Sequence, residues 1–128
     1  MYGYYMPKDS PSSGLGHRHE WENVVVWLSS DTASATLIGV AASQHGDYVT
    51  STTPSVSGPG GPRIKYESIW PVNHSLWFTN TVGGQQPLIA WESLPAAARN
   101  ALQTTDFGDA TVSFRDGDFE NNLVKAAL

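Results

Sequence analysis

The chain has 128 residues, enough for one domain but not two, and its lack of cysteine excludes disulfides and thiolate metal sites within it. Its 7 basic and 12 acidic residues give a net charge of −5, which argues against a nucleic-acid-binding protein because such proteins present a basic surface. With 40% apolar and 15% charged residues the chain is too apolar to be disordered, yet no segment approaches the roughly 20 apolar residues of a membrane-spanning helix.

The 12 glycines and 8 prolines favour short strands and turns over long helices. The first predicted strand covers 2–6, which is rich in β-forming residues, stops at Pro7 and is followed by a polar loop over 7–16. Residues 17–22 then lead into 24–28, where consecutive apolar residues predict a central strand that is buried on both faces.

The later elements are predicted from the same kinds of pattern. Further strands are predicted over 35–42, 48–53, 63–69, 76–81 and 111–114, and the Pro- and Gly-rich stretch 54–62 is predicted to be a loop. One helix is predicted over 95–103, with Ser93 as its N-cap and Pro95 in its first turn. The tail over 119–128 has apolar residues at helical spacing.

The segment 17–22, His-Arg-His-Glu-Trp-Glu, concentrates ionisable groups beside the central apolar strand. Burying an unpaired charge is costly, so this concentration indicates that the charges have partners. In a strand, Glu20 and Glu22 point to the same side and lie roughly 6.5–7 Å apart. His17 is an odd number of positions from both, so its side chain would point to the opposite side. His17 can join the two carboxylates only if 17–19 is loop or contains a bulge.

Asp9, in the preceding loop, can complete this group with a third carboxylate. One imidazole and several carboxylates suit a hard or borderline divalent ion such as Mg²⁺, Mn²⁺ or Ca²⁺. A tetrahedral zinc site is less natural, because no thiolate and no set of three histidines is available. Two other interpretations stay open from spacing alone: a charged strand edge in solvent, and a pair of catalytic carboxylates as in an inverting glycosidase. A cupin-type metalloenzyme is a third, since the spacing of His17, His19 and Glu22 is similar to the first cupin motif.

Residues 16–22 (GHRHEWE) resemble the signature heptapeptide of the necrosis- and ethylene-inducing peptide 1-like proteins, the NPP1 family. Residues 1–2, 5–11 and 14–16 resemble the signature segment that precedes this heptapeptide in the family. Residues 90–95, 98–99 and 105–108 resemble the family's C-terminal region, so the resemblance covers nearly the whole chain.

The resemblance implies a single partial domain over 1–128: an all-β-dominated, actinoporin-like β-sandwich with peripheral helices, from which the family's N-terminal strands are missing. It implies a secreted, extracellular protein whose signal peptide is not in this chain. The best-known members are cytolytic toxins of eudicot plants that bind glycosyl inositol phosphoryl ceramide, a sphingolipid of the outer leaflet. We therefore expect binding and membrane damage rather than catalysis, with peripheral membrane contact and no nucleic acid.

The resemblance also implies site residues. The family's divalent cation, Mg²⁺ or Ca²⁺, sits in an acidic cavity whose residues match Asp9, His17, Glu20 and Glu22. A tryptophan and a histidine that meet the lipid headgroup match Trp70 and His74, and Asn73 lies beside them. We add His19 to these ligand-binding residues and expect it to pair with an acid inside the cavity.

Three further expectations follow from the resemblance. The segment 1–21 resembles the family's immunogenic peptide, so a plant pattern-recognition receptor is an expected partner. Glu20 stands where the family usually has Asp, and the extra methylene should disturb Mg²⁺, the geometrically stricter ion, more than Ca²⁺. Missing strands would leave open sheet edges, so the isolated chain is expected to fold poorly and to lyse cells weakly. The alternative function is a metal-dependent enzyme, cupin-like or a glycosidase, that uses the same histidine and glutamates.

Overall fold

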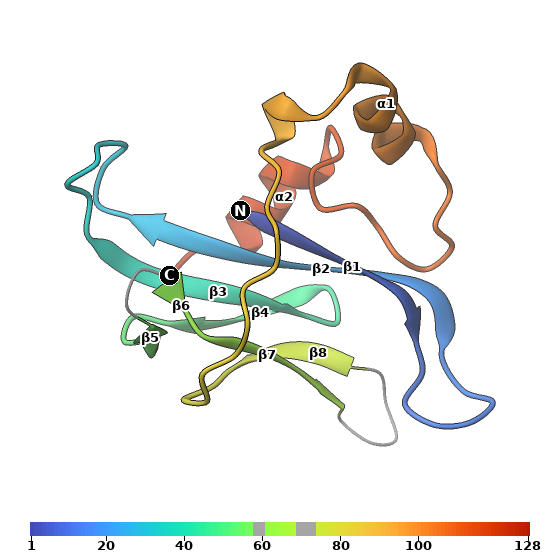
Figure 1. Cartoon of the computed structure of the whole chain (residues 1–128), viewed down its shortest axis with the longest axis horizontal. Coiled ribbons are helices and arrows are strands. Elements are labelled where there is room, and N and C mark those ends of the chain that lie inside the picture. The colour runs from blue at the N-terminus through green and yellow to red at the C-terminus, as the bar shows by residue number, and fades with distance from the viewer. Residues whose placement is uncertain (58–60, 69–73) are drawn as a thin grey trace.

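The computed structural model describes residues 1–57, 61–68 and 74–128, and its centre is a four-stranded antiparallel sheet (Figure 1). The strands are β1 (Tyr2–Asp9), β2 (His17–Leu28), β3 (Leu37–Gln44) and β4 (Asp47–Ser51), and they neighbour one another in chain order. β2 is the central strand that its apolar run predicts. β3 joins it only from Val24 onward, so within the described residues the first part of β2 pairs with β1 alone.

The remaining strands form two short pairs, β5 (Val56–Ser57) with β6 (Gly61–Pro62) and β7 (Ile64–Ser68) with β8 (His74–Phe78). The β7–β8 pair packs against one face of the sheet. Four buried side chains form the cluster between these two layers: Val24, Val40, Ala42 and Leu76. Two β-layers packed across an apolar core confirm the predicted all-β-dominated sandwich.

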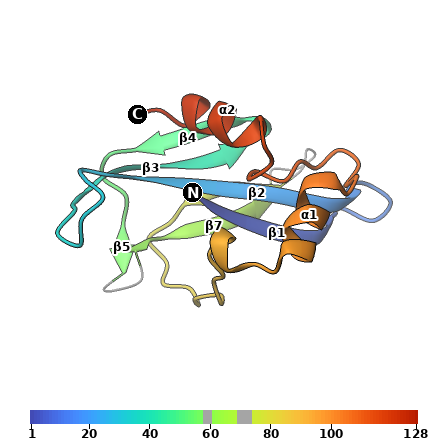
Figure 2. The ribbon, with the colours of Figure 1, turned by 90° about the horizontal axis from the view of Figure 1, so that it is seen from above.

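Short helices surround this sandwich: the 3₁₀ turn η2 (Trp91–Ser93), α1 (Ala96–Thr104) and α2 (Asp118–Lys125). Figure 2 shows α2 on the side of the sheet opposite β7. Val25, Ala41 and Ala126 form the buried cluster beneath it, and Trp27 Nε1 donates a hydrogen bond of 2.8 Å to the Ala126 carbonyl oxygen. Because β2 is covered by β8 on one face and α2 on the other, it needs apolar residues at consecutive positions.

β1 is longer than predicted, because it continues through Pro7 and ends at Asp9. β1 lies at the edge of the sheet, where a proline can be accommodated because a missing N–H on the outer side breaks no ladder bond. The extension matters for the site, since it makes Asp9 a strand residue paired with His17 rather than a loop residue. The predicted loop 54–62 also contains the short β5–β6 pair.

Two other local predictions are wrong. Ser93 does not cap α1: the helix has Pro95 at its N-cap position, and Leu94 is extended, as a residue before proline prefers to be. The segment 111–114 is not a strand. Val112 is fully buried and lines a small cavity next to α1, so its apolar character reflects packing rather than strand pairing.

Two backbone conformations shape the β1–β2 hairpin. Gly16 has φ 92°, and a Cβ at this position would lie 2.1 Å from the Asp9 carbonyl oxygen, so only glycine fits. His19 has φ 63°, a left-handed conformation inside a strand. The pairs Asp9–His17 and Met6–Glu20 keep one register on both sides of it. The left-handed residue therefore breaks the alternation of side chains without inserting a residue.

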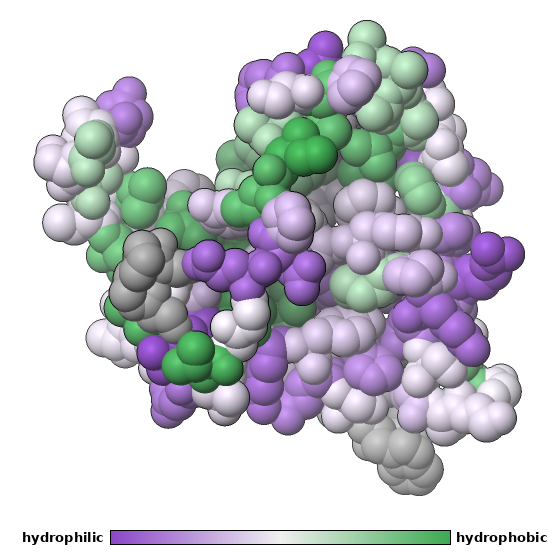
Figure 3. All heavy atoms as spheres, in the orientation of Figure 1, coloured by the Kyte–Doolittle hydropathy of each residue, from purple (hydrophilic) through white to green (hydrophobic). Residues whose placement is uncertain are grey.

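The connection from β8 to η2 contains no helix or strand over 79–90. It carries three of the most exposed apolar side chains in the described chain, Val82 (69% exposed), Leu88 (68%) and Ile89 (69%). Figure 3 shows green apolar patches on the face that this connection crosses. Among the described residues, none of the helices has the length and apolar character needed to cross a membrane.

Candidate functional site

Asp9, His17 and Glu20 converge at the loop end of the β1–β2 hairpin. One possible ligand atom from each lies within 4.8 Å of the other two. His17 Nε2 is 3.4 Å from Glu20 Oε2 and 3.9 Å from Asp9 Oδ2, and the Asp9 side chain is completely buried. Two carboxylates held this close are unfavourable without a positive charge or a proton between them. The donor chemistry of this cation cluster, two carboxylate oxygens and one imidazole nitrogen, therefore fits a hard divalent ion.

Hydrogen bonds orient the two β2 members of the cation cluster. His17 Nδ1 donates to the His19 carbonyl oxygen at 2.9 Å, which leaves Nε2 as the nitrogen facing Glu20 and Asp9. Glu20 Oε1 accepts the Trp21 backbone N–H at 2.9 Å, which leaves Oε2 facing His17. The left-handed His19 between them brings both side chains to one side of β2. The prediction that this would need a loop or a bulge over 17–19 is wrong, because these residues are in the strand and keep one register with β1.

His74, at the start of β8, is a direct neighbour of Asp9. Its Nδ1 donates a short hydrogen bond to Asp9 Oδ1, and its backbone N–H donates to Asp9 Oδ2 at 3.3 Å. The His74 ring stacks on Tyr66 with ring centroids 4.8 Å apart. Burial, followed by the nearby carboxylates, raises the pKa of the Tyr66 hydroxyl. Asp9 thus joins the two β-layers, and the predicted headgroup histidine lies beside the cation cluster.

Glu22 lies further along β2 and is only 6% exposed. Its Oε2 accepts a short hydrogen bond from the Ser43 hydroxyl, whose oxygen accepts the Asn23 backbone N–H at 2.8 Å. Burial raises the pKa of Glu22 to about 7, with smaller contributions from the two neighbouring carboxylates, although the Ser43 hydrogen bond acts in the opposite direction. Glu22 is not one of the three residues whose ligand atoms converge within 4.8 Å, so its role as a ligand stays a prediction.

The pKa values of Glu20 and His17, on the same strand, are also raised. Burial raises the pKa of Glu20, against the opposing effects of the Trp21 N–H and the His17 ring. Burial would lower the pKa of His17, but its backbone hydrogen bonds and the carboxylates of Glu20 and Asp9 raise it overall. Each of these groups therefore holds a proton more tightly in the folded chain than it would in water.

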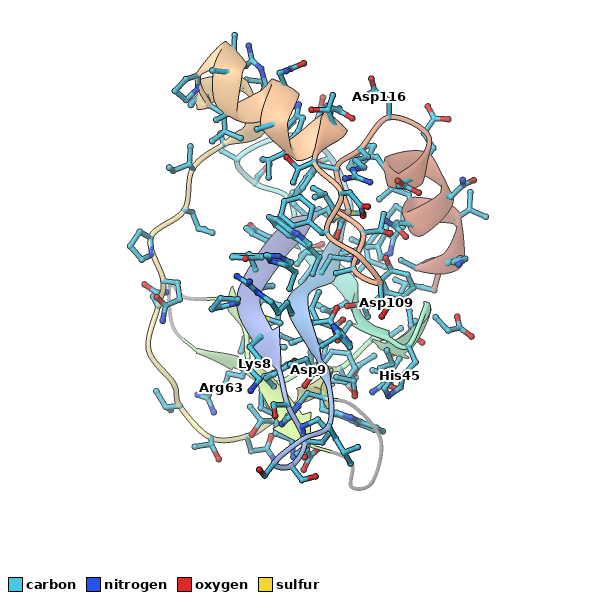
Figure 4. The ribbon with its side chains drawn as sticks, turned by 90° about the vertical axis from the view of Figure 1, so that its right-hand side faces the viewer. Lys8, Asp9, His45, Arg63, Asp109 and Asp116 are labelled. Carbon is cyan, nitrogen blue, oxygen red and sulfur yellow. The ribbon has the colours of Figure 1, made fainter. Side chains whose placement is uncertain are left out.

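The cation cluster opens into a cavity of about 410 Å³ that extends past the tip of the β3–β4 hairpin. His17, Glu20 and His74 line one end, and the segment 109–113 and helix α2 contribute to the other. Figure 4 shows the loop that carries Asp109 descending toward the hairpin that carries His45, with Asp9 on β1 at about the same height as His45. The volume lies within the roughly 300–1,000 Å³ of small-molecule sites, which is large enough for a sugar.

The prediction that His19 pairs with an acid inside the cavity is wrong. Its Nδ1 shares a hydrogen bond of 2.7 Å with the Tyr5 hydroxyl, and its ring meets Phe107 edge-on at 5.4 Å. The left-handed backbone places this side chain among aromatic residues instead of carboxylates. Trp70 and Asn73 lie outside the described residues.

Sequence reasoning missed Ser43 and the segment 109–113 as walls of the cavity. The one available signal for Ser43 is that it interrupts the apolar run of β3. No local pattern connects 109–113 with residues some 90 positions earlier, because their proximity depends on how α1 and α2 pack on the sheet.

The chain is a two-layered β-sandwich with an acidic, imidazole-containing cluster beside a polar cavity. The profile of the family described as "Necrosis inducing protein (NPP1)" matches residues 1–126, and the chain belongs to this family.

Relatives support this assignment over almost the full chain. NLP effector protein 14 of Phytophthora capsici is 47% identical over 129 residues, covering 98% of this chain and 97% of that protein. The structure titled "NLPPya in complex with mannosamine" has a TM-score of 0.91 and 50% identity, and the same protein has been solved with glucosamine. The structure of "non-toxic HaNLP3 protein" has a TM-score of 0.91 and 41% identity. The chain spans 60% of the length of each of these solved proteins.

Proposed function

We propose that the chain binds the sugar headgroup of a plant sphingolipid, glycosyl inositol phosphoryl ceramide, through a divalent cation, Mg²⁺ or Ca²⁺, held by the cation cluster. The protein acts outside the producing cell and damages the plant plasma membrane. The observation that carries this proposal is the convergence of the Asp9, His17 and Glu20 ligand atoms within 4.8 Å, beside a cavity that His17 and Glu20 line. The amino-sugar complexes of a relative that is 50% identical support a sugar as the ligand.

The chain's own residues have separate tasks in this proposal. Asp9, Glu20 and the unprotonated Nε2 of His17 supply the cation's protein ligands, with Glu22 as a fourth candidate. The cation, when bound, supplies coordination positions for sugar hydroxyls. His74 fixes both oxygens of Asp9 from the second layer. In this proposal His74 contacts the headgroup, and Trp70 and Asn73, which precede it in the sequence, are its expected partners in this task. Binding in this proposal is peripheral and specific for the headgroup, since a chain with 7 basic and 12 acidic residues is not attracted to anionic lipid by its net charge.

The test combines calorimetry with vesicle leakage. Mg²⁺ and Ca²⁺ are titrated into the chain, and the chain is then added to dye-loaded vesicles with and without the plant sphingolipid. Asp9→Asn and Glu20→Gln each remove a negative ligand and are expected to weaken cation binding by at least about tenfold, the lower end of the losses seen at metal sites. Both variants should lose binding to the sphingolipid vesicles and any leakage of dye.

Asp31→Asn is the matched control, because Asp31 is an exposed carboxylate in the β2–β3 connection. It should leave cation binding, vesicle binding and leakage unchanged. Leakage that survives both Asp9→Asn and Glu20→Gln would show that the cation cluster is not the working site. Vesicle binding without leakage would place this chain with a non-toxic relative such as HaNLP3 and would remove membrane damage from the proposal.

The proposal excludes turnover, and the same samples test that exclusion. A cupin-like enzyme or a glycosidase would release sugar or headgroup into solution while the ceramide stays in the vesicle. Intact lipid after incubation supports a binding protein. Release of headgroup that depends on Glu20 would establish the enzyme instead.

We further propose that a plant pattern-recognition receptor detects the segment 1–21. This segment comprises β1, the following loop and the start of β2, and it carries the exposed side chains of Tyr2 and Tyr5 on an edge strand. A synthetic peptide of residues 1–21 should trigger an ethylene response in responsive leaves without lysis. An inactive peptide, beside an active flagellar-peptide control, would remove this partner.

A further inference from the structure

β2 and β3 separate beside the cavity, and the Ser43 side chain bridges them at that point. The ladder between the two strands begins at the pair Val24–Ala42, one residue after Asn23. There the Asn23 backbone N–H donates to the Ser43 hydroxyl oxygen at 2.8 Å, and Ser43 is only 8% exposed. Ser43 therefore accepts a backbone donor of β2 that lies outside the regular β2–β3 ladder.

The second contact of the Ser43 hydroxyl is with Glu22. A serine hydroxyl has one hydrogen to donate, while its oxygen can accept. Because the Ser43 oxygen accepts the Asn23 N–H, its single hydrogen is left for Glu22 Oε2, to which it donates a short hydrogen bond. Fixing a long side chain in one rotamer costs conformational entropy, and in the folded chain this cost is met before any ligand arrives. Glu22 is thus oriented in advance.

This orientation leaves the other carboxylate oxygen of Glu22 available. Among the hydrogen bonds and ion pairs of the described residues, the Glu22 carboxylate takes part through Oε2 alone. Glu22 lines the cavity with His17 and Glu20, and the nearby carboxylates of Glu20 and Asp9 act on it electrostatically. Oε1 is therefore the Glu22 oxygen that an ion beside the cation cluster can use.

We propose that Ser43 is a positioning residue of the cation site, which holds Glu22 so that its Oε1 serves as a further protein ligand. Ser43 contributes no ligand atom and acts only through Glu22. This inference rests on the proposed function, which supplies the cation. It makes the affinity for the cation depend on β3, although the residues of the cation cluster come from β1 and β2.

The test is calorimetric titration of Ca²⁺ into the full chain at pH 8, above the Glu22 pKa of about 7. Ser43→Ala removes the donor to Glu22 and should weaken Ca²⁺ binding by about tenfold, the lower end of the losses seen when an outer partner of a metal ligand is removed. Ser43→Thr keeps the hydroxyl and suits a strand, so it should restore the affinity to within about threefold of the original. An affinity of Ser43→Thr no better than that of Ser43→Ala overturns the inference.

A double-mutant cycle tests whether Ser43 acts through Glu22. Glu22→Gln removes the negative ligand and should itself weaken Ca²⁺ binding. In that background Ser43→Ala should add less than about a twofold loss, because residues that act as one unit are not additive. Losses that multiply in the double variant would show that Ser43 affects the site independently of Glu22 and would overturn the inference.

Tyr48→Phe is the matched structural control. The Tyr48 hydroxyl donates to Asn23 Oδ1 at 2.7 Å, so this variant loses a hydrogen bond of the same β3–β4 hairpin without touching Glu22. It should lower Tm but leave Ca²⁺ affinity within about twofold of the original. A loss of affinity equal to that of Ser43→Ala would show that the integrity of the hairpin, and not the orientation of Glu22, controls the site.

Asp9→Asn separates this inference from the proposed function. Weak Ca²⁺ binding in Asp9→Asn together with an unchanged affinity in Ser43→Ala supports the proposed function and overturns the role of Ser43. Ca²⁺ binding that depends on Ser43 in a chain that ignores sphingolipid vesicles supports the role of Ser43 and contradicts the proposed function. An unaltered chain that binds no Ca²⁺ contradicts both.

Discussion

Glu22, Glu20 and His17 have raised pKa values, so the folded chain without a cation binds more protons than the unfolded chain does. Stability falls with rising pH wherever the folded state holds more protons. For Glu22 this loss begins near the unfolded pKa of 4.5 and is complete above the folded pKa of about 7. For His17 the stabilisation is full below 6.5 and is lost as pH rises through its folded pKa. All three residues therefore act in the same direction.

The first prediction concerns Glu22→Gln, which keeps the side-chain shape and removes the charge. In EDTA, the free energy of unfolding of the unaltered chain should fall between pH 5 and 8. That of the variant should fall by up to about 3 kcal/mol less over the same range. Urea unfolding at four pH values measures the difference, and the comparison cancels the contributions of other groups. Parallel curves for the two proteins would show that Glu22 ionises normally in the fold.

The second prediction concerns Glu20, at a position where the resemblance leads us to expect aspartate. Glu20→Asp shortens the side chain by one methylene, which should improve Mg²⁺ binding by about a few-fold relative to Ca²⁺, since Mg²⁺ tolerates less distortion. Calorimetric titration of both ions gives the ratio. An unchanged ratio would mean that Glu20 reaches the ion through water instead of direct coordination.

At the scale of elements, the left-handed residue in β2 determines which side chains share a face. His17 and Glu20 are three positions apart, and without His19 at φ 63° they would lie on opposite sides of the strand. A β-branched residue resists this conformation more strongly than asparagine does. The geometry of the cation cluster thus depends on a residue that contributes no ligand atom.

The third prediction compares His19→Val with His19→Asn. Both lose the hydrogen bond to Tyr5, so the difference between them isolates the backbone conformation. The His19→Val protein should be less stable than the His19→Asn protein by about 1–2 kcal/mol and should also bind Ca²⁺ more weakly. Equal stability and equal Ca²⁺ affinity would show that the left-handed conformation is not required.

The strands and the cation cluster could be predicted to different extents. The apolar run of β2 specifies a strand buried on both faces, and the ionisable residues of 17–22 specify a hard-ion donor set. The continuation of β1 through Pro7 depends on its place at the sheet edge, which no local pattern records. Likewise, the placement of His74 on Asp9 joins residues 65 positions apart and follows from the packing of two layers.

At the scale of the whole molecule, the site holds the two β-layers together. Asp9 ends the edge strand of the main sheet, and its two oxygens accept hydrogen bonds from His74 at the start of β8. The carboxylate is fully buried, so removal of its charge or of these bonds affects the fold as well as the function.

The fourth prediction is that Asp9→Asn destabilises the chain by about 1–3 kcal/mol even in EDTA, because a buried acceptor of two hydrogen bonds is altered. Saturating Ca²⁺ should raise the Tm of the unaltered chain, by an amount that grows with the ratio of ion concentration to Kd, and should leave the variant unchanged. Differential scanning calorimetry measures both effects, with Asp31→Asn as the control. A variant that Ca²⁺ still stabilises fully would remove Asp9 from the set of ligands.

The anchoring of Asp9 has a kinetic consequence. The His74 ring donates to Oδ1 and the His74 backbone N–H donates to Oδ2, so the carboxylate is held in one orientation before an ion arrives. Each carboxylate oxygen has more than one lone pair, so Oδ2 can coordinate an ion while His74 stays in place. Entry then needs no rearrangement of Asp9, and Mg²⁺, which gives up its water reluctantly, should enter more slowly than Ca²⁺.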